Sequence, residues 1–297
     1  MEPHICENRA DVGHPANDMA HDTFDLEALE AALAGSRYAG KLHFLPAIAS
    51  TNTHAMQQAE EGAPDGSVYF ADEQTAGRGR GDHAWESAPG KGLYVSVLLR
   101  PRLASADVLW LSLAAGLAVR SAVRATTTLE ADLRWPNDLL FGKRKFCGIL
   151  TELNSENPPQ RASALTGAET ARVRHAVVGI GINVHQARFS PELLATSLRV
   201  ETGHEWPRQE LLLALLQSLD SEVAALTDSA ERAAQSIRER LERGSSWIRG
   251  KRVRVEERGD GLGGFAGVTD GLDARGFLRV RTPAGMRTVL SGGVRGG

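Results

Sequence analysis

Cysteine is scarce in this chain of 297 residues, which contains only Cys6 and Cys147. Two cysteines so far apart exclude a disulfide framework, and neither stands in the CxxC spacing of a zinc site. We therefore expect Cys147 to be a small buried hydrophobic residue with no redox or metal-binding role.

Long apolar runs are also missing. The longest run, residues 108–119, is shorter than the roughly 18–20 residues that cross a bilayer, and Ser112 and Gly116 interrupt it. The N-terminus lacks the basic and then apolar pattern of a secretion signal. These features predict a cytoplasmic protein that does not enter a membrane.

Neither sign of charge is in strong excess, because the formal net charge is −3. Proteins that wrap nucleic acid usually present a strongly basic face, and residues 1–40 contain one short helical pattern instead of a helix-turn-helix. We therefore expect no specific DNA binding. The shares of hydrophobic residues (42%) and charged residues (24%) are typical of a globular protein.

Helical and strand patterns both occur along most of the chain, so we expect a fold that contains helices and strands. Residues 1–22 show no periodicity and are expected to be a disordered leader. Residues 154–174 are rich in Asn, Pro, Ala, Arg and Gly and are interpreted as a surface connection. We expect helices at residues 23–35, 51–62, 107–123, 208–226 and 230–243, and strands at residues 42–45, 68–71, 92–100 and 177–184, with a hairpin around residues 142–143.

The pattern changes after the flexible joint that residues 244–246 are expected to form. Four short strands, at residues 251–256, 264–269, 276–280 and 286–290, are separated by glycine turns. This spacing predicts a small SH3-like β-barrel. The chain is accordingly divided into the leader, a main domain at residues 23–246 and a C-terminal β domain at residues 247–297.

The hairpin at residues 134–152, RWPNDLLFGKRKFCGILTE, is the most informative segment. It places Lys145 three residues before the side-chain-free Gly148, where a flat or anionic ligand could approach the backbone. Lys145 is therefore a candidate inward-facing lysine, although it could be one of three surface cations at residues 143–145. Asn137 and Asp138 could equally serve only to complete the turn after Pro136.

A second candidate segment is the glycine–arginine loop at residues 77–81, GRGRG. Its arginines could pair with a phosphate or carboxylate while the flexible backbone folds over the ligand as a lid. Without ligand we expect it to be mobile, and Trp85 is placed to pack the closed loop. A solvated turn or an RNA-binding RGG-like segment are the alternatives.

Two further segments carry polar groups that could contact a ligand. Residues 50–52, Ser-Thr-Asn, begin a helix, where exposed amides and hydroxyls suit a polar ring or an anion, although a plain helix cap explains them equally well. Residues 179–184, GIGINV, lack the third glycine and the following helix of a dinucleotide fingerprint. They are interpreted as a strand that allows close approach, with Asn183 either a buried amide or a ligand contact.

The content and order of these motifs over residues 40–245 resemble the catalytic core of biotin protein ligases. The resemblance implies a mixed-sheet α+β domain followed by a small C-terminal domain. It also implies an AMP-forming reaction that uses ATP with Mg²⁺, in which the carboxylate of biotin attacks the α-phosphorus. The resulting biotinyl-5′-adenylate then acylates a lysine of a biotin carboxyl carrier domain.

The resemblance also implies roles for individual residues. Lys145, Arg78 and Arg80 would be catalytic cations that stabilise the crowded anionic transition state; no metal-binding residue is implied. The biotin site would comprise Ser50, Thr51, Asn52, Gln74, Gly77, Arg78, Lys145 and Gly148. The nucleotide site would comprise Arg80, Trp85, Asn137, Asp138 and Asn183.

Residues 81–84, Gly-Asp-His-Ala, depart from the family pattern, which usually has a further Gly-Arg pair there. This departure predicts weaker or pH-sensitive lid closure. The nearest alternative is a lipoate ligase, but the chain contains no Arg-Arg pair of the kind in that family's signature. A non-catalytic biotin sensor is the alternative from a different class, and the presence of Lys145 argues against it.

Overall fold

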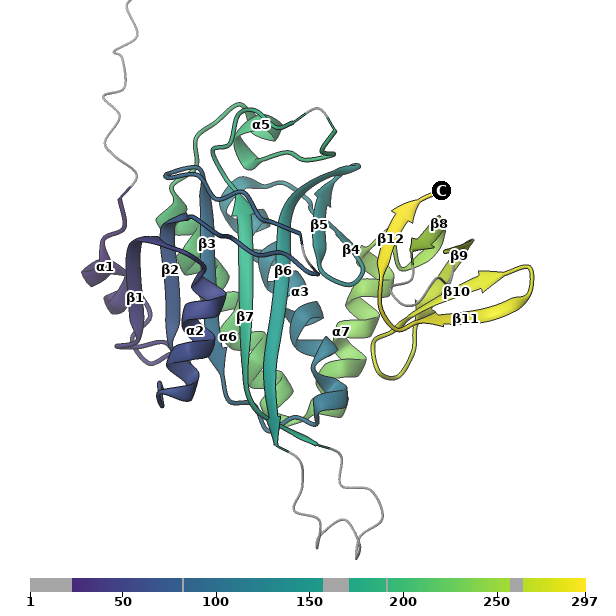
Figure 1. The fold of residues 1–297 in the computed structure, drawn as a ribbon, viewed down its shortest axis with the longest axis horizontal. Helices are drawn as coiled ribbons and strands as arrows, with labels where there is room; N and C mark the ends of the chain where they lie inside the picture. The colour runs from purple at the N-terminus through teal and green to yellow at the C-terminus, as the bar shows by residue number, and fades with distance from the viewer. Residues whose placement is uncertain (1–22, 82, 157–170, 191, 257–263) are drawn as a thin grey trace, which may run out of the picture.

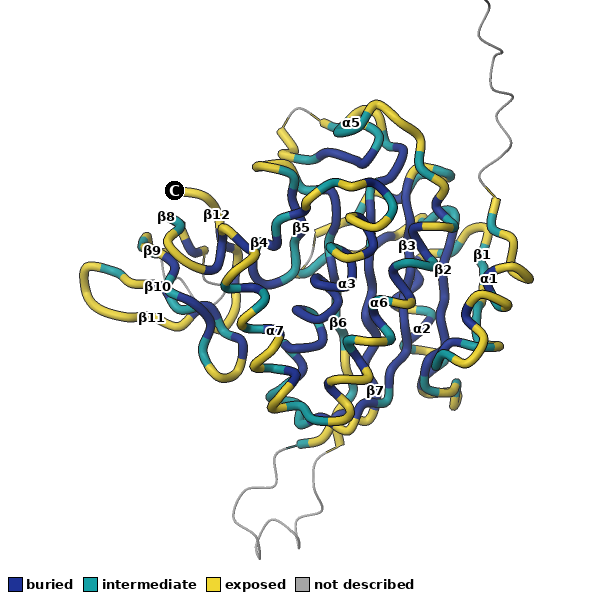
Figure 2. The backbone as a smooth tube through the Cα atoms, turned by 180° about the vertical axis from the view of Figure 1, so that it is seen from behind, coloured by how far each residue is buried: buried dark blue, intermediate teal, exposed yellow. Residues whose placement is uncertain are grey.

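The computed structural model describes residues 23–81, 83–156, 171–190, 192–256 and 264–297. A seven-stranded mixed sheet forms the centre, with helices on both faces, and a second sheet lies beside them at the C-terminus (Figures 1 and 2). The predicted α+β class is thereby confirmed. The division into domains stays a prediction, as does the leader, because residues 1–22 lie outside the described residues.

The large sheet has the strand order β1-β2-β3-β7-β6-β5-β4. Only β1 and β2 run parallel, and every other neighbouring pair is antiparallel. Its strands are β1 (Leu42–Ile48), β2 (Val68–Gln74), β3 (Gly92–Leu99), β4 (Asp132–Arg134), β5 (Asp138–Phe141), β6 (Arg144–Glu156) and β7 (Arg172–Asn183).

The helices cover the sheet unequally. Helix α2 lies on one face, while α3, α6 and α7 lie on the other (Figures 1 and 2). Short elements complete the set, namely the 3₁₀ turn at Ser105–Asp107, α1 and α5. The helix bounds are α1 (Leu26–Ala32), α2 (Thr51–Glu60), α3 (Leu109–Thr127), α5 (Leu198–Thr202), α6 (Arg208–Asp228) and α7 (Ala230–Gly244).

Helix α3 shows why composition alone is a weak guide to membranes. Ser105–Thr127 is the only stretch among the described residues that is long and apolar enough for a membrane-spanning helix, yet 61% of its apolar 18-residue part is buried inside the protein. It packs against α6 and α7 on one side and β6 and β7 on the other. Its apolar composition therefore reflects burial on several sides.

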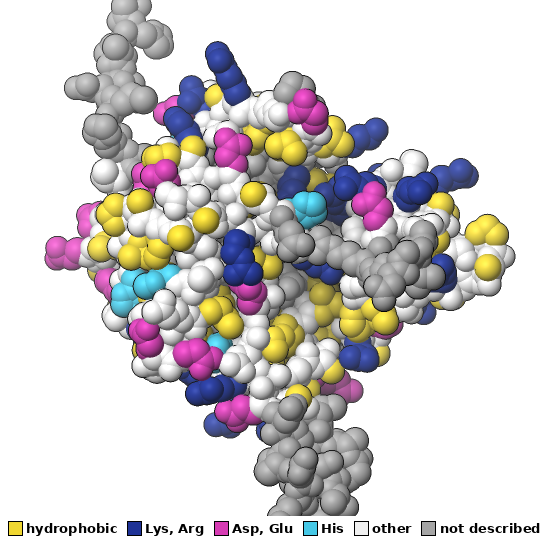
Figure 3. All heavy atoms as spheres, in the orientation of Figure 1, with side chains coloured by type: hydrophobic (Ala, Val, Ile, Leu, Met, Phe, Trp, Pro, Cys, Tyr) yellow, Lys and Arg dark blue, Asp and Glu magenta, His cyan; other side chains and the backbone are white. Residues whose placement is uncertain are grey.

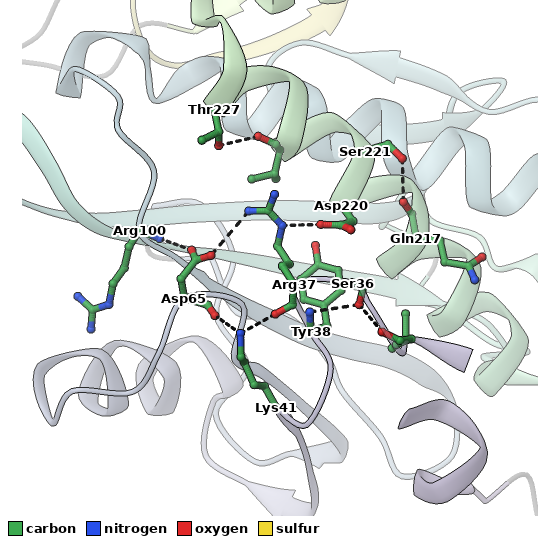
Figure 4. A network of polar contacts seen from close by, with 12 residues as sticks. Ser36, Arg37, Tyr38, Lys41, Asp65, Arg100, Gln217, Asp220, Ser221 and Thr227 are labelled. Carbon is green, nitrogen blue, oxygen red and sulfur yellow. Dashed lines mark hydrogen bonds and ion pairs between the residues drawn. The ribbon is translucent and has the colours of Figure 1, made fainter. Parts of the chain in front are cut away.

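A polar network connects the turn between α1 and β1 to helix α6 (Figure 4). The Arg37 guanidinium lies between the carboxylates of Asp220 and Asp65. Lys41 donates hydrogen bonds to the carbonyl oxygens of Arg37 and Asp65, at 2.7 and 2.8 Å. These contacts hold the start of β1 against the core, and with it the α2 segment that follows.

The C-terminal sheet has the strand order β11-β10-β9-β8-β12. Its apolar residues belong to the same contiguous core as those of the large sheet. The size and antiparallel pattern agree with the predicted SH3-like domain. Its strands are β8 (Arg249–Glu256), β9 (Phe265–Leu272), β10 (Leu278–Thr282), β11 (Gly285–Val289) and β12 (Gly293–Gly296).

The junction between the two sheets is tied down by hydrogen bonds. Ser245 Oγ donates to the carbonyl of Leu133 at 2.7 Å, and the Ser246 backbone N–H donates to the Asp132 carboxylate at 3.2 Å. The buried indole of Trp135 donates to the Gly276 carbonyl at 2.9 Å. The expectation of a flexible joint at residues 244–246 is therefore wrong, because edge strand β4 binds the joint.

Most predicted helices and strands are present, with ends shifted by a few residues. The surface connection predicted at 154–174 is wrong at both ends, because β6 continues to Glu156 and β7 starts at Arg172; residues 157–170 are outside the described residues. The short elements β4, α5, β12 and the 3₁₀ turn were not predicted. Each spans five residues or fewer, too short to display a period.

Candidate active site

A pocket lies where the start of α2, the end of β2 with the loop after it, and the strands β3, β6 and β7 meet, with Asn137 just before β5 also lining it. Ten of the predicted site residues line it: Ser50, Thr51, Asn52, Gln74, Arg78, Arg80, Trp85, Asn137, Lys145 and Gly148. They come from segments up to about a hundred positions apart in the chain. The fold therefore brings together in space motifs whose sequence showed only their order along the chain.

Lys145 projects from β6 towards the neighbouring strand. Its ammonium lies 2.6 Å from Asp138 of β5, and Arg134 lies 2.6 Å from the other oxygen of the same carboxylate. Burial disfavours ionisation of Asp138, but the charges of Lys145 and Arg134 outweigh this and hold the pKa of its carboxyl below the ordinary value. Asp138 is thus an ionised anchor that orients two cations.

A β-bulge between β5 and β6 explains the orientation of this lysine. The register shifts between Leu139 and Leu140, so that Leu139 faces Cys147 while Leu140 faces Lys145. Phe146 and Cys147 are consequently both buried, and Lys145 is left facing the pocket. Burial raises the pKa of the Cys147 thiol, which agrees with its predicted role as a small hydrophobic residue.

Residues 77–81 and 83–85 form a short antiparallel hairpin that we call the lid hairpin. The Gly79 N–H donates to the His83 carbonyl at 2.8 Å, and the Trp85 N–H donates to the Gly77 carbonyl at 2.9 Å. A side chain at Gly77 would overlap the Trp85 carbonyl, so this glycine serves the hairpin itself. The predicted mobility of the hairpin without ligand stays a prediction, and Asp82 is outside the described residues.

Trp85 lies inside the pocket against two glycines. A Cβ atom at Gly181 would come within 2.6 Å of its indole nitrogen, and one at Gly148 within 3.0 Å of its ring. The Lys145 ammonium lies 5.1 Å from the ring centroid, within cation–π range. The buried Nε1–H has no hydrogen-bond partner among the described residues. Trp85 therefore packs the lid hairpin onto the sheet and has one donor left for a ligand.

A buried polar network forms the floor of the pocket at the start of α2. The side-chain oxygen of Gln74 accepts hydrogen bonds from the Thr51 N–H and hydroxyl, at 2.9 and 3.0 Å. The Ser96 hydroxyl lies 2.8 Å from Thr51 Oγ1 and 2.7 Å from Asn52 Oδ1. A side chain at Gly179 would overlap Asn52. These contacts give the floor a fixed pattern of donors and acceptors.

The two arginines of the lid hairpin reach in different directions. Arg78 pairs with Glu152 of β6 at 2.8 Å and donates to Thr53 Oγ1 at 3.2 Å. Arg80 donates to the carbonyl of Gly292, before β12, at 2.7 Å. One arginine thus contacts α2 and β6 while the other contacts the C-terminal sheet.

Three predicted site residues do not line the pocket. Gly77 shapes the hairpin, Asp138 anchors Lys145, and Asn183 donates to the Thr196 carbonyl at 3.0 Å. The roles assigned to all thirteen residues stay predictions. The lining residues that sequence reasoning missed are Gly79, Tyr94, Val95, Ile149, Leu150, Gly179, Ile180 and Gly181. Gly179 and Gly181 gave a sequence signal as positions that allow close approach, and Gly79 gave one as part of the flexible glycine–arginine loop.

The arrangement suits an anionic ligand with a flat part. Lys145, Arg78 and Arg80 supply three cations to one pocket, and Lys and Arg side chains gather between the large sheet and the C-terminal sheet (Figure 3). Among the described residues, no group of three or more His, Cys, Asp and Glu could hold a metal ion. Lys145, Arg78 and Arg80 equip the pocket to stabilise negative charge.

The chain is similar in sequence to a family of known proteins. The model of the biotin/lipoate A/B protein ligase family matches residues 44–183. A bifunctional ligase/repressor BirA of Bacillus spizizenii is 32% identical over 249 residues, which cover 82% of this chain and 70% of that protein. A biotin–[acetyl-CoA-carboxylase] ligase of Mycobacterium tuberculosis is 33% identical over 247 residues, covering 81% and 82%.

A solved structure of biotin protein ligase from Aquifex aeolicus, in complex with biotin and ATP, has a similar fold. Its TM-score is 0.69 at 29% sequence identity, and the match covers 87% of this chain and 100% of that chain. The similarity therefore extends over almost the whole described fold.

Proposed function

The chain belongs to the biotin/lipoate A/B protein ligase family, and we propose that it joins biotin to a lysine of a biotin carboxyl carrier domain at the expense of ATP. The reaction has two steps. The carboxylate of biotin attacks the α-phosphorus of ATP, which gives biotinyl-5′-adenylate and pyrophosphate. The amine of the acceptor lysine then attacks the acyl carbon, and AMP leaves.

The pocket suits the first step because two anions must meet in it. Lys145 and Arg78 would hold the carboxylate and the α-phosphate in contact, and their charges would offset the negative charge of the transition state. No protein nucleophile is required, since the substrate carboxylate attacks directly. Mg²⁺ would enter with ATP, bound largely through the phosphate oxygens.

The polar floor suits the uncharged ring system of biotin. Thr51, Gln74 and Asn52 present hydroxyl and amide groups in a pocket that also has an apolar wall. Such a combination of a few oriented polar groups and apolar surface is typical of small-molecule sites. Trp85 and Asn137 would then lie against the nucleotide.

The second step needs the adenylate to be shielded from water and still open to the acceptor. The lid hairpin covers the pocket from one side, and Arg80 joins it to the C-terminal sheet. Closing a site in this way limits hydrolysis of a labile mixed anhydride. The carrier domain would reach the adenylate beside this closed lid.

The observation that carries the proposal is the Lys145–Asp138 pair inside a pocket that also holds Arg78 and Trp85. Incubation of the purified protein with ATP, Mg²⁺, labelled biotin and a purified carrier domain should label the carrier. A carrier whose acceptor lysine is replaced by arginine should stay unlabelled. Labelling that does not require ATP would contradict the proposal.

Two further expectations accompany this function. The enzyme is expected in the cytoplasm, where its acceptor would be made. It is also not expected to bind DNA specifically, because the formal net charge of −3 gives no basic excess. Both stay predictions.

A further inference from the structure

Glu152 of β6 connects the polar floor of the pocket with the lid hairpin. Its Oε1 lies 2.8 Å from Arg78 Nη2, and its Oε2 accepts a hydrogen bond from Asn52 Nδ2 at 2.9 Å. We propose that Glu152 is a positioning residue that holds Arg78, and with it the lid hairpin, over the pocket so that the acyl-adenylate is retained. This inference rests on the proposed function.

The floor side of this connection is rigid. Asn52 is only 4% exposed, and its amide also contacts the Leu150 carbonyl and the Ser96 hydroxyl. Glu152 is therefore oriented by a side chain that is itself held by two other groups. A carboxylate on such a rigid support is a suitable anchor for a more mobile cation.

The lid side has more freedom. The Arg78 side chain is 50% exposed, and Gly77 and Gly79 flank it in the chain. Without an anchor, its long side chain would lose considerable rotamer freedom on closing over a ligand. The pair with Glu152 limits that freedom before the ligand arrives, which favours the closed hairpin.

The contact with Glu152 leaves Arg78 able to bind a ligand. A guanidinium has five N–H donors, and the described contacts use one on Glu152 and one on Thr53. The remaining donors are available to a carboxylate or phosphate in the pocket. Glu152 and the ligand would therefore hold Arg78 together instead of competing for it.

The variant Glu152→Gln tests this inference. Glutamine keeps an oxygen that accepts from Asn52, but it places an uncharged amide beside Arg78. We expect preformed biotinyl-adenylate to leave the variant about fivefold faster, as befits a partly exposed ion pair. Acylation of lysines on an added non-carrier protein should rise in parallel. ATP–pyrophosphate exchange at saturating biotin and ATP should fall by a smaller factor than release rises, because Lys145 and Arg78 are both retained.

Three further variants make the result specific. Glu156→Gln removes another carboxylate of β6, one that pairs with Arg174, and should leave the release rate unchanged. In an Arg78→Ala background, Glu152→Gln should have no additional effect on release, because its partner is gone. If Glu152→Gln does not fold, Glu152→Asp, which retains the charge at a shorter reach, should show a smaller acceleration.

Unchanged or slower release from Glu152→Gln would overturn the inference, and slower release would show that Glu152 competes with the ligand. An equal effect in the Arg78→Ala background would also overturn it. These outcomes are distinct from failure of the proposed function, in which the unaltered protein itself would show no biotin-dependent exchange.

Discussion

The Lys145 ammonium and the Asp138 carboxylate lie 2.6 Å apart on neighbouring strands of one hairpin. The register places Asp138 opposite Gly148, which has no side chain and so leaves room for the Lys145 ammonium and the Trp85 ring. Arg134 contacts the same carboxylate from β4. The candidate catalytic lysine is therefore oriented before any substrate binds, and this preorganisation underlies the predictions below.

Replacing Lys145 by alanine should nearly abolish adenylate formation. Loss of a preorganised group that stabilises transition-state charge typically raises the barrier by about 2.7–4 kcal/mol, or roughly 10²–10³-fold in rate. The measurement is the single-turnover rate of adenylate formation. Lys143→Ala, in the exposed turn of the same hairpin, is the matched control and should retain the parent rate. Near-parent activity of Lys145→Ala would refute the assigned role.

Replacing Asp138 by asparagine should reduce both activity and stability. Two cations would lose their shared anion, which should cost about 1–3 kcal/mol of unfolding free energy at neutral pH. Because the pKa of Asp138 is lowered in the folded protein, its ionised form stabilises the fold above the ordinary carboxyl pKa. That contribution is lost as the pH falls through the lowered pKa of the folded state.

Denaturant unfolding of the parent and of Asp138→Asn from pH 7 to pH 3 checks this linkage. The difference in unfolding free energy should be largest at neutral pH and should shrink towards pH 3. A difference that stays constant over this range would show that the charge of Asp138 does not stabilise the fold.

Replacing Gly181 by alanine should displace Trp85 from the pocket. The added Cβ would come within 2.6 Å of the indole nitrogen, far inside van der Waals contact. We expect weaker retention of the adenylate, by about tenfold, and altered tryptophan fluorescence, with the fold preserved. Gly296→Ala is the control, because the nearest atom to its added Cβ is 3.7 Å away. Equal adenylate retention in the two variants would contradict this account of Trp85.

Replacing Trp135 by phenylalanine should destabilise the attachment of the C-terminal sheet. The change keeps an aromatic ring but leaves the Gly276 carbonyl without its indole donor, at a cost of about 1–3 kcal/mol. Denaturant unfolding followed by circular dichroism measures the effect. Trp206→Phe, whose indole bonds the half-buried Thr202 hydroxyl, should cost less. Equal losses of unfolding free energy in the two variants would show that the Trp135 hydrogen bond contributes no more than that of Trp206.

Local patterns made much of the fold and part of the site predictable from the sequence. Ser50 caps α2 as its residue type indicates. The hairpin that carries Lys145 follows from two apolar strands around Gly142, which has a φ of +60°. Both depend on neighbours within a few residues, which a single sequence displays directly.

The remaining features depend on contacts between distant segments. Asn52 meets Glu152 from 100 positions away, and Ser96 joins Asn52 across 44 positions. Neither pairing leaves a periodic signal in the sequence. The predicted flexibility of the junction at Ser245 and Ser246 was wrong for the same reason. Its small polar residues suggested a flexible joint, but their hydrogen-bond partners lie on the distant strand β4.

Biotin-dependent exchange between ATP and pyrophosphate, with lipoate as the control acid, tests the central claim most directly. It measures the first step alone and needs neither a carrier domain nor a variant. The account predicts exchange that requires biotin and is lost when lipoate replaces it. Exchange that lipoate supports as well as biotin, or no exchange with biotin, would contradict the account.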